Sequence, residues 1–230
     1  MRFLFLIFAV LFYTNSVFAQ LQGGISGTYF TQSLPNWETT IFGFRSNEQL
    51  LKSGFGQAVD LKIAGFDNYR IQFHLNVGTN NATTSLENRQ FKLRKNDISL
   101  SGKIFFLSLE ADCDCPTFSR EAGLLEKGLF AEFITGASFF QAEMGEENTI
   151  ISEDNGTAFK VGFGLGVEIG INDYVTISPF VRYQRYLNVE WEGLQEDLFL
   201  FDPTTVIDGT NTTPINQVSA GIRLGLSLQR

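Results

Sequence analysis

The sequence is poor in the residues from which most enzyme active sites and metal centres are built. Its 230 residues include one histidine and two cysteines, too few for most catalytic triads or multi-ligand metal sites. We therefore expect no enzyme, catalytic residue, metal or cofactor. Charged residues make up 18% of the chain, below the roughly 25% typical of soluble domains. The formal net charge of -8 repels phosphate backbones, which excludes a nucleic-acid partner.

Long apolar runs are absent except at the N-terminus. The run from Phe3 to Tyr13 is too short to cross a membrane as a helix. Small residues follow at Val17 and Ala19, at the spacing typical of a signal-peptidase site. We therefore expect residues 1–19 to be a secretory signal peptide cleaved after Ala19, with an N-terminal anchor as the alternative. Residues 20–230 then form one barrel domain.

Alternation of apolar and polar residues is the main pattern of the remaining chain. From Tyr69 to Val77 every odd residue is apolar and every even residue is polar, as in a strand with two different faces. Residues 159–171 and 218–228 repeat this pattern. Since no later stretch approaches 18 apolar residues, any membrane insertion would use strands. We expect eight strands, at residues 23–33, 54–64, 69–77, 98–109, 128–141, 158–171, 174–187 and 216–229.

Strand length and glycine placement favour a membrane barrel over a soluble barrel or sandwich, which is the alternative. Most expected strands have about 10 to 14 residues, enough to cross a bilayer at a tilt, whereas strands of soluble sheets average about 5 to 6. The polar face of residues 159–171 carries four glycines, which suit a crowded lumen. The predicted fold is all-β, an eight-stranded antiparallel up-and-down transmembrane β-barrel.

Connection lengths predict the orientation of this barrel. Outer-membrane barrels have short periplasmic turns and long external loops. If both termini are periplasmic, all four external connections are long. The outward-facing aromatic residues then lie near the external ends of the strands, where an aromatic girdle is expected. The long periplasmic connection at residues 110–127 is an exception. The external connections are residues 34–53, 78–97, 142–157 and 188–215, and the girdle residues are Tyr29, Phe55, Phe139, Phe159 and Tyr183.

One motif near the C-terminus adds a family resemblance. Ser219 to Leu226 fits the pattern polar, any, Gly, any, any, apolar, any, apolar. With this motif and the alternation, the chain resembles the small outer-membrane β-barrel proteins of Gram-negative bacteria, the OmpA-like and PorT-like barrel domains. The chain departs from their usual terminal aromatic residue by running on to Arg230. The resemblance implies an outer-membrane location, contact with membrane lipid and lipopolysaccharide, and the barrel assembly machinery as a partner.

Charged residues on the polar strand faces predict a lumen charge network. An eight-stranded barrel is just wide enough for side chains to fill it, so these charges should pair as a salt-bridged plug. A narrow anion-preferring channel is the alternative. The single histidine is expected to be a hydrogen-bonded lumen residue and not the base of a lipid-modifying enzyme. The predicted network comprises Asp60, Lys62, Arg70, His74, Lys103, Glu132, Lys160, Glu168, Arg182 and Arg223.

The connections carry the remaining candidate sites. The sequence allows a disulfide between Cys113 and Cys115, with idle thiols or a soft-metal site as alternatives. Residues 142–157 and 188–215 are acidic and contain no lysine or arginine. We expect these acidic segments to be solvated surfaces or to bind divalent cations. Trp191 adds exposed apolar surface to the second segment, which we expect to pack on the rim of the barrel or to dock a partner.

These features predict a non-enzymatic envelope protein that acts through its surface loops, in envelope integrity, adhesion or binding of a protein partner. Three other functions stay open at this stage. The PorT-like resemblance allows a component of an outer-membrane secretion or assembly complex. The lumen charges allow a narrow channel, and a lipid-modifying enzyme is the least favoured.

Overall fold

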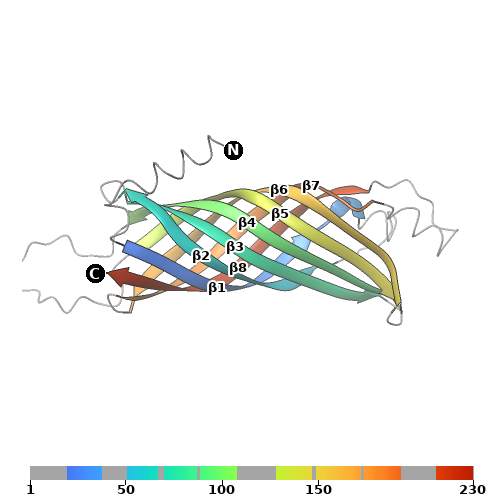
Figure 1. The fold of residues 1–230 in the computed structure, drawn as a ribbon, viewed down its shortest axis with the longest axis horizontal. Coiled ribbons are helices and arrows are strands. Elements are labelled where there is room, and N and C mark those ends of the chain that lie inside the picture. The colour runs from blue at the N-terminus through green and yellow to red at the C-terminus, as the bar shows by residue number, and fades with distance from the viewer. Residues whose placement is uncertain are drawn as a thin grey trace, which may run out of the picture.

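The computed structural model describes residues 20–37, 51–66, 70–86, 89–107, 128–146, 149–171, 174–192 and 211–229. The predicted signal peptide and both cysteines, Cys113 and Cys115, lie outside the described residues. The described chain forms eight strands (Figure 1). Their bounds are β1 Gln20–Ser33, β2 Ser53–Phe66, β3 Ile71–Leu86, β4 Arg89–Leu107, β5 Gly128–Glu146, β6 Thr149–Gly170, β7 Val175–Glu190 and β8 Thr212–Gln229.

The eight strands form one closed antiparallel barrel in chain order. Strands β1 and β8 close it along the whole of β1, from the pair Gln20 and Gln229 to the pair Ser33 and Asn216. This confirms the predicted up-and-down barrel. Strand β1 begins and β8 ends at the same end of the barrel (Figure 1), which we call the terminal end. Strand β3 ends and β4 begins at the opposite end, as do the end of β5 and the start of β6, and we call it the hairpin end (Figure 1).

Two predicted long loops are wrong, because these segments continue as strands. Residues 78–86 belong to β3 and residues 89–97 to β4, and residues 142–146 belong to β5 and residues 149–157 to β6. The alternation changes its phase there: Phe91 and Leu93 are buried inside, whereas Lys92 and Arg94 face outward. The sequence prediction assumed that apolar residues face outward along every strand. It therefore missed the parts of the strands that extend beyond the bilayer and enclose an apolar core.

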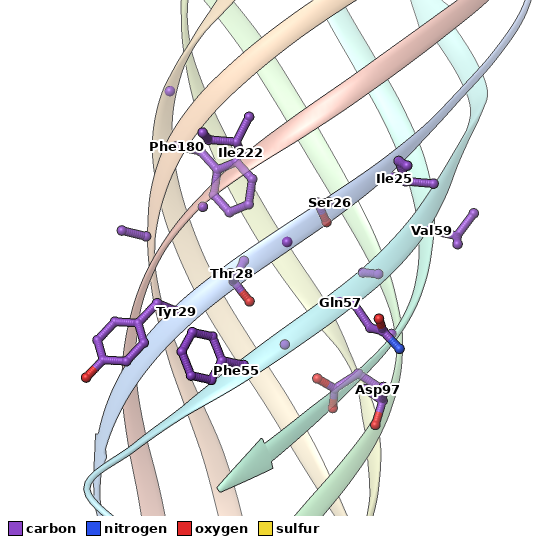
Figure 2. A pocket seen from close by; sticks show the side chains of 18 of the residues that line it. Ile25, Ser26, Thr28, Tyr29, Phe55, Gln57, Val59, Asp97, Phe180 and Ile222 are labelled. Atoms are coloured by element: carbon purple, nitrogen blue, oxygen red, sulfur yellow. The ribbon is translucent and has the colours of Figure 1, made fainter.

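A belt of exposed apolar side chains surrounds the barrel. Phe55, Phe163 and Leu226 are 71%, 61% and 62% exposed. Figure 2 shows Tyr29 beside Phe55 on neighbouring strands, with ring centroids 5.3 Å apart. A continuous apolar belt on a closed barrel is the surface of a membrane-spanning protein. None of the helical residues among those described forms a helix long and apolar enough to cross a membrane.

The closed hydrogen-bond ladder predicts resistance to detergent. Since the eight strands leave no unpaired barrel edge, opening the barrel must break many backbone hydrogen bonds at once. We expect the protein, extracted in mild detergent, to run at a different position on a denaturing gel before and after boiling. An identical position in both lanes, with the protein recovered as a soluble species, would contradict a membrane barrel.

Candidate functional site

The barrel interior is the candidate site, and its composition changes along the barrel axis. Apolar side chains fill the hairpin end, charged and amide side chains fill the middle, and a cluster of Phe105, Phe130 and Phe180 lies toward the terminal end. The inward-facing side chains come from all eight strands because alternate residues of each strand point into the lumen.

Two tryptophans close the hairpin end. Trp37 and Trp191 are fully buried, with ring centroids 5.4 Å apart in an edge-to-face arrangement. Trp37 lies in a helical segment, residues 35–37, which directly follows β1. We call the surrounding buried cluster the apolar plug. It consists of Phe30, Leu34, Trp37, Leu51, Ala82, Phe91, Leu93, Phe140, Ala142, Met144, Ala158, Tyr186, Val189, Trp191 and Ile215.

Hydrogen bonds hold the plug across the mouth of the barrel. The Trp37 indole Nε1 donates to the Asn211 carbonyl oxygen at 2.8 Å, and the Trp191 Nε1 donates to Ser152 Oγ at 3.2 Å. The side-chain amide of Asn36 donates to the Thr212 carbonyl oxygen at 2.7 Å. The chain after β1 is therefore tied to the start of β8. Trp191 was predicted to pack on the rim or to dock a partner, and the structure buries it fully in the mouth of the barrel.

A fully buried lysine lies directly beneath the plug. Lys95 Nζ donates to Gln32 Oε1 at 2.7 Å and to Gln217 Oε1 at 2.6 Å. The same ammonium group lies 4.5 Å from the Tyr186 ring centroid and 5.0 Å from that of Phe30, a cation–π arrangement. Sequence reasoning missed Lys95 because it assigned residues 78–97 to a loop.

Asp97, also missed, anchors the next layer. Its carboxylate lies 3.0 Å from Lys160 Nζ. The Asn80 amide donates to the same oxygen, Oδ2, at 2.8 Å, and the Tyr186 hydroxyl donates to it at 3.2 Å. A cavity of about 50 Å³ lies beside these groups, which is room for only one or two water molecules.

A bidentate ion pair beside this cavity joins β5 to β7 over the inner face of β6. Arg182 donates from Nε to Glu132 Oε2 at 2.7 Å and from Nη2 to Oε1 at 3.1 Å. A Cβ at Gly164 would lie 2.9 Å from Arg182 Cγ and 3.4 Å from Glu132 Oε2. The glycine therefore leaves the space that this pair occupies, in agreement with the crowded lumen expected from the β6 glycines.

A second bidentate pair involves the single histidine. Arg223 donates from Nε and Nη2 to the two Asp60 oxygens, both at 2.7 Å. His74 Nδ1 lies 3.1 Å from Asp60 Oδ2, and its Nε2 lies 3.3 Å from Gln72 Oε1. Both ring nitrogens therefore have hydrogen-bond partners within the lumen, and the imidazole is held as a structural group.

The structure brings most of the predicted network residues into the interior, with one correction. Arg70 is exposed in the turn before β3, with φ of 51°. The alternation of apolar and polar residues in the sequence begins before the strand does, so it assigned Arg70 to a strand face. Lys62 and Arg182 are partly buried. Lys103 Nζ lies 4.9 Å from the Phe130 centroid and interacts electrostatically with Glu132 and Glu168. The fully buried members are Asp60, His74, Lys103, Glu132, Lys160, Glu168 and Arg223.

Chemically, this arrangement offers charges that are fixed in place, by ion pairs for the carboxylates and by two amide oxygens for Lys95. The carboxylates of Asp60, Asp97 and Glu132 each accept from a cationic side chain. Among the described residues, no group of three His, Cys, Asp or Glu side chains is arranged to hold a metal ion. The interior therefore has the features of a rigid structural core.

Comparisons with known proteins give similar structures but no family. No protein-family model matches the chain, and no curated protein matches it. Neisserial surface protein A is 14% identical, with a TM-score of 0.47 over 89% of this chain and 96% of that chain. Ail, the attachment invasion locus protein of Yersinia pestis, is 7% identical, with a TM-score of 0.45 over 90% and 99%. OprG from Pseudomonas aeruginosa is 9% identical, with a TM-score of 0.38 over 92% and 95%.

Proposed function

We propose that this protein is an integral outer-membrane β-barrel that neither conducts ions nor catalyses a reaction, and that presents a rigid surface at its hairpin end. The observation that carries this proposal is the apolar plug. Trp37 and Trp191 fill the mouth of the barrel, where a channel needs an open path. Envelope integrity, adhesion or binding of a partner are functions that such a closed surface supports.

Two further features support an outer-membrane location. A transmembrane barrel with an even number of antiparallel strands and an apolar belt is the architecture of bacterial outer-membrane proteins. The predicted signal peptide supplies the export that such a location requires. The hairpin end then faces the cell exterior, and both ends of the barrel sequence face the periplasm.

The charged layers also argue against conduction. Below the plug, Glu132 pairs with Arg182, and Asp60 pairs with Arg223. An ion crossing the lumen would have to displace these buried bidentate pairs, each of which is costly to break. The barrel is therefore blocked at two levels, by apolar packing at the hairpin end and by paired charges in the middle.

We expect no steady current when the purified, folded protein is inserted into a planar lipid bilayer at moderate voltage. The reason is that both the plug and the paired charges must open for an ion to pass. A general porin inserted in the same bilayer is the positive control, and the gel shift on boiling shows that the sample is folded. Reproducible single-channel steps from this protein would refute the closed-barrel proposal.

Several other predicted partners and roles stay predictions. The secretion-complex role depends on residues 110–127, which lie outside the described residues. Divalent cations at the acidic segments and the barrel assembly machinery likewise stay predictions. In the β5–β6 hairpin, Glu153 accepts from Gln141 at 2.8 Å, and Asp154 accepts from the Glu192 backbone nitrogen at 2.6 Å. These two carboxylates already have partners within the chain.

A further inference from the structure

Beyond the apolar belt, toward the hairpin end, the outer surface of the barrel carries a polar collar. On β4 the outward residues change abruptly from Ile98 and Leu100 to Asn96, Arg94 and Lys92. A strand rises about 3.3 Å per residue and tilts about 40°. Arg94 therefore lies roughly 10 Å beyond Ile98 along the membrane normal. Because Ile98 is the last exposed apolar residue of β4 in this direction, we infer that Arg94 lies at the level of the lipid head groups.

The charges of this collar are segregated around the barrel. Over β2 to β4, the described outward residues of the collar include no carboxylate, and Lys52 is exposed just before β2. Over β5 to β7, the exposed or half-buried residues include Glu143, Glu153 and Glu190. We call the first part the basic sector. Its outward polar residues are Ser53, Gln57, Thr79, Asn81, Thr83, Ser85, Gln90, Lys92, Arg94 and Asn96.

Arg94 lies in the middle of a row of hydrogen-bond donors. Its direct cross-strand neighbours are Asn81 on β3 and Gln141 on β5, and side chains at such positions are about 5 Å apart. The guanidinium group donates in a planar fork that matches a phosphate group, and the Asn81 amide can donate beside it, whereas the Gln141 amide donates to Glu153. Lys92 is two residues away on the same face.

Lys92 is only weakly engaged by the neighbouring acid. Its Nζ lies 3.9 Å from Glu143 Oε2, and the lysine side chain is 51% exposed. An exposed pair at this distance contributes little and exchanges readily for a better partner. A chain with a net charge of -8 thus presents Lys92 and Arg94 together on the outer face of β4, with Glu143 as the neighbouring acid.

We propose that the basic sector binds the phosphate groups of outer-leaflet lipopolysaccharide, with Arg94 as the principal contact and Lys92 as the second. The proposal rests on the outer-membrane location proposed above. The arguments are the depth of Arg94, the complementary charge and the row of donors. The acidic sector repels the same phosphates, so the lipid contact is on one side of the barrel.

The test compares two forms of one lipid on the full, folded protein in detergent. The probes are bisphosphorylated lipid A and fully dephosphorylated lipid A, and retained lipid is measured by native mass spectrometry. We expect the wild-type protein to prefer the bisphosphorylated form by about tenfold, the size expected for one or two charge-assisted hydrogen bonds. The K92Q/R94Q variant is expected to lose this preference.

A matched control distinguishes lipid A binding at a local site from an effect of the overall charge of the protein. Arg185 is exposed on β7, so R185Q removes one positive charge from the acidic sector. We expect R185Q to change lipid A retention less than twofold and R94Q alone to lower it severalfold. All these positions are exposed, and the gel shift on boiling confirms that each variant is folded.

Two results would overturn the basic-sector proposal. One is equal retention of the two lipid A forms by the wild-type protein. The other is an equal loss in R185Q and R94Q, which would mean that net charge alone governs retention. Neither result bears on the closed barrel, because the bilayer conductance measurement tests that proposal separately.

Discussion

Replacing Arg223 by methionine is expected to lower the stability of the barrel by about 3 to 5 kcal/mol, the usual cost of removing one partner of a buried ion pair. Asp60 is only 6% exposed and accepts two hydrogen bonds of 2.7 Å from Arg223. Without the arginine, the buried carboxylate loses its two shortest hydrogen bonds and keeps His74 as a hydrogen-bond partner and Lys103 as an electrostatic neighbour. The measurement is the urea midpoint of unfolding in detergent micelles, read from the gel shift.

A double variant separates the loss of the pair from the loss of packing. We expect D60L/R223M to recover much of the stability lost in R223M, because apolar residues of similar volume need no charged partner. R185Q, which changes an exposed arginine, is expected to keep the wild-type midpoint within the error of the measurement. If R223M were as stable as the wild type, Asp60 and Arg223 would not form the buried pair described here.

Replacing Trp191 by alanine is expected to open the apolar plug while leaving the membrane barrel closed. Trp191 is fully buried against Trp37, and truncating a buried tryptophan costs about 3 to 5 kcal/mol. That loss is confined to the hairpin end, since the strand ladder and the apolar belt do not involve this side chain. Bilayer conductance should stay absent because the paired charges below still block the lumen.

Fluorescence offers a direct readout of this change. The chain has two tryptophans, and both lie in the plug, so in W191A the remaining emission comes from Trp37 alone. We expect wild-type emission to be shielded from acrylamide and Trp37 emission in W191A to be quenched severalfold more strongly. Y174A, at an exposed position near the terminal end, is the control and should behave as the wild type. Equal quenching of W191A and wild type would contradict a plug closed by these two rings.

The alternation of apolar and polar residues predicted the strands well where the barrel faces lipid. On β6, Phe163 and Leu165 face outward and the intervening glycines face inward, as their alternation indicates. The same pattern failed beyond the belt, where Phe91 and Leu93 face inward. Outside the barrel, polar surroundings replace the hydrocarbon of the membrane at this level, so the apolar face reverses while the strand continues. Lys95 and Asp97, which lie beside this reversal, were missed for that reason.

Local sequence alone determined that this chain forms eight antiparallel strands with a lipid-facing side, because period-two alternation is a property of neighbouring residues. It also determined the direction in which side chains such as Glu132 and Arg223 point. Only the tertiary structure decided which side chains meet. Asp60 and Arg223 are 163 residues apart in the chain, and Trp37 meets Trp191 across the mouth. These contacts depend on strand register and on closure between β1 and β8, which bring the first and last strands of the chain together and which no local pattern encodes.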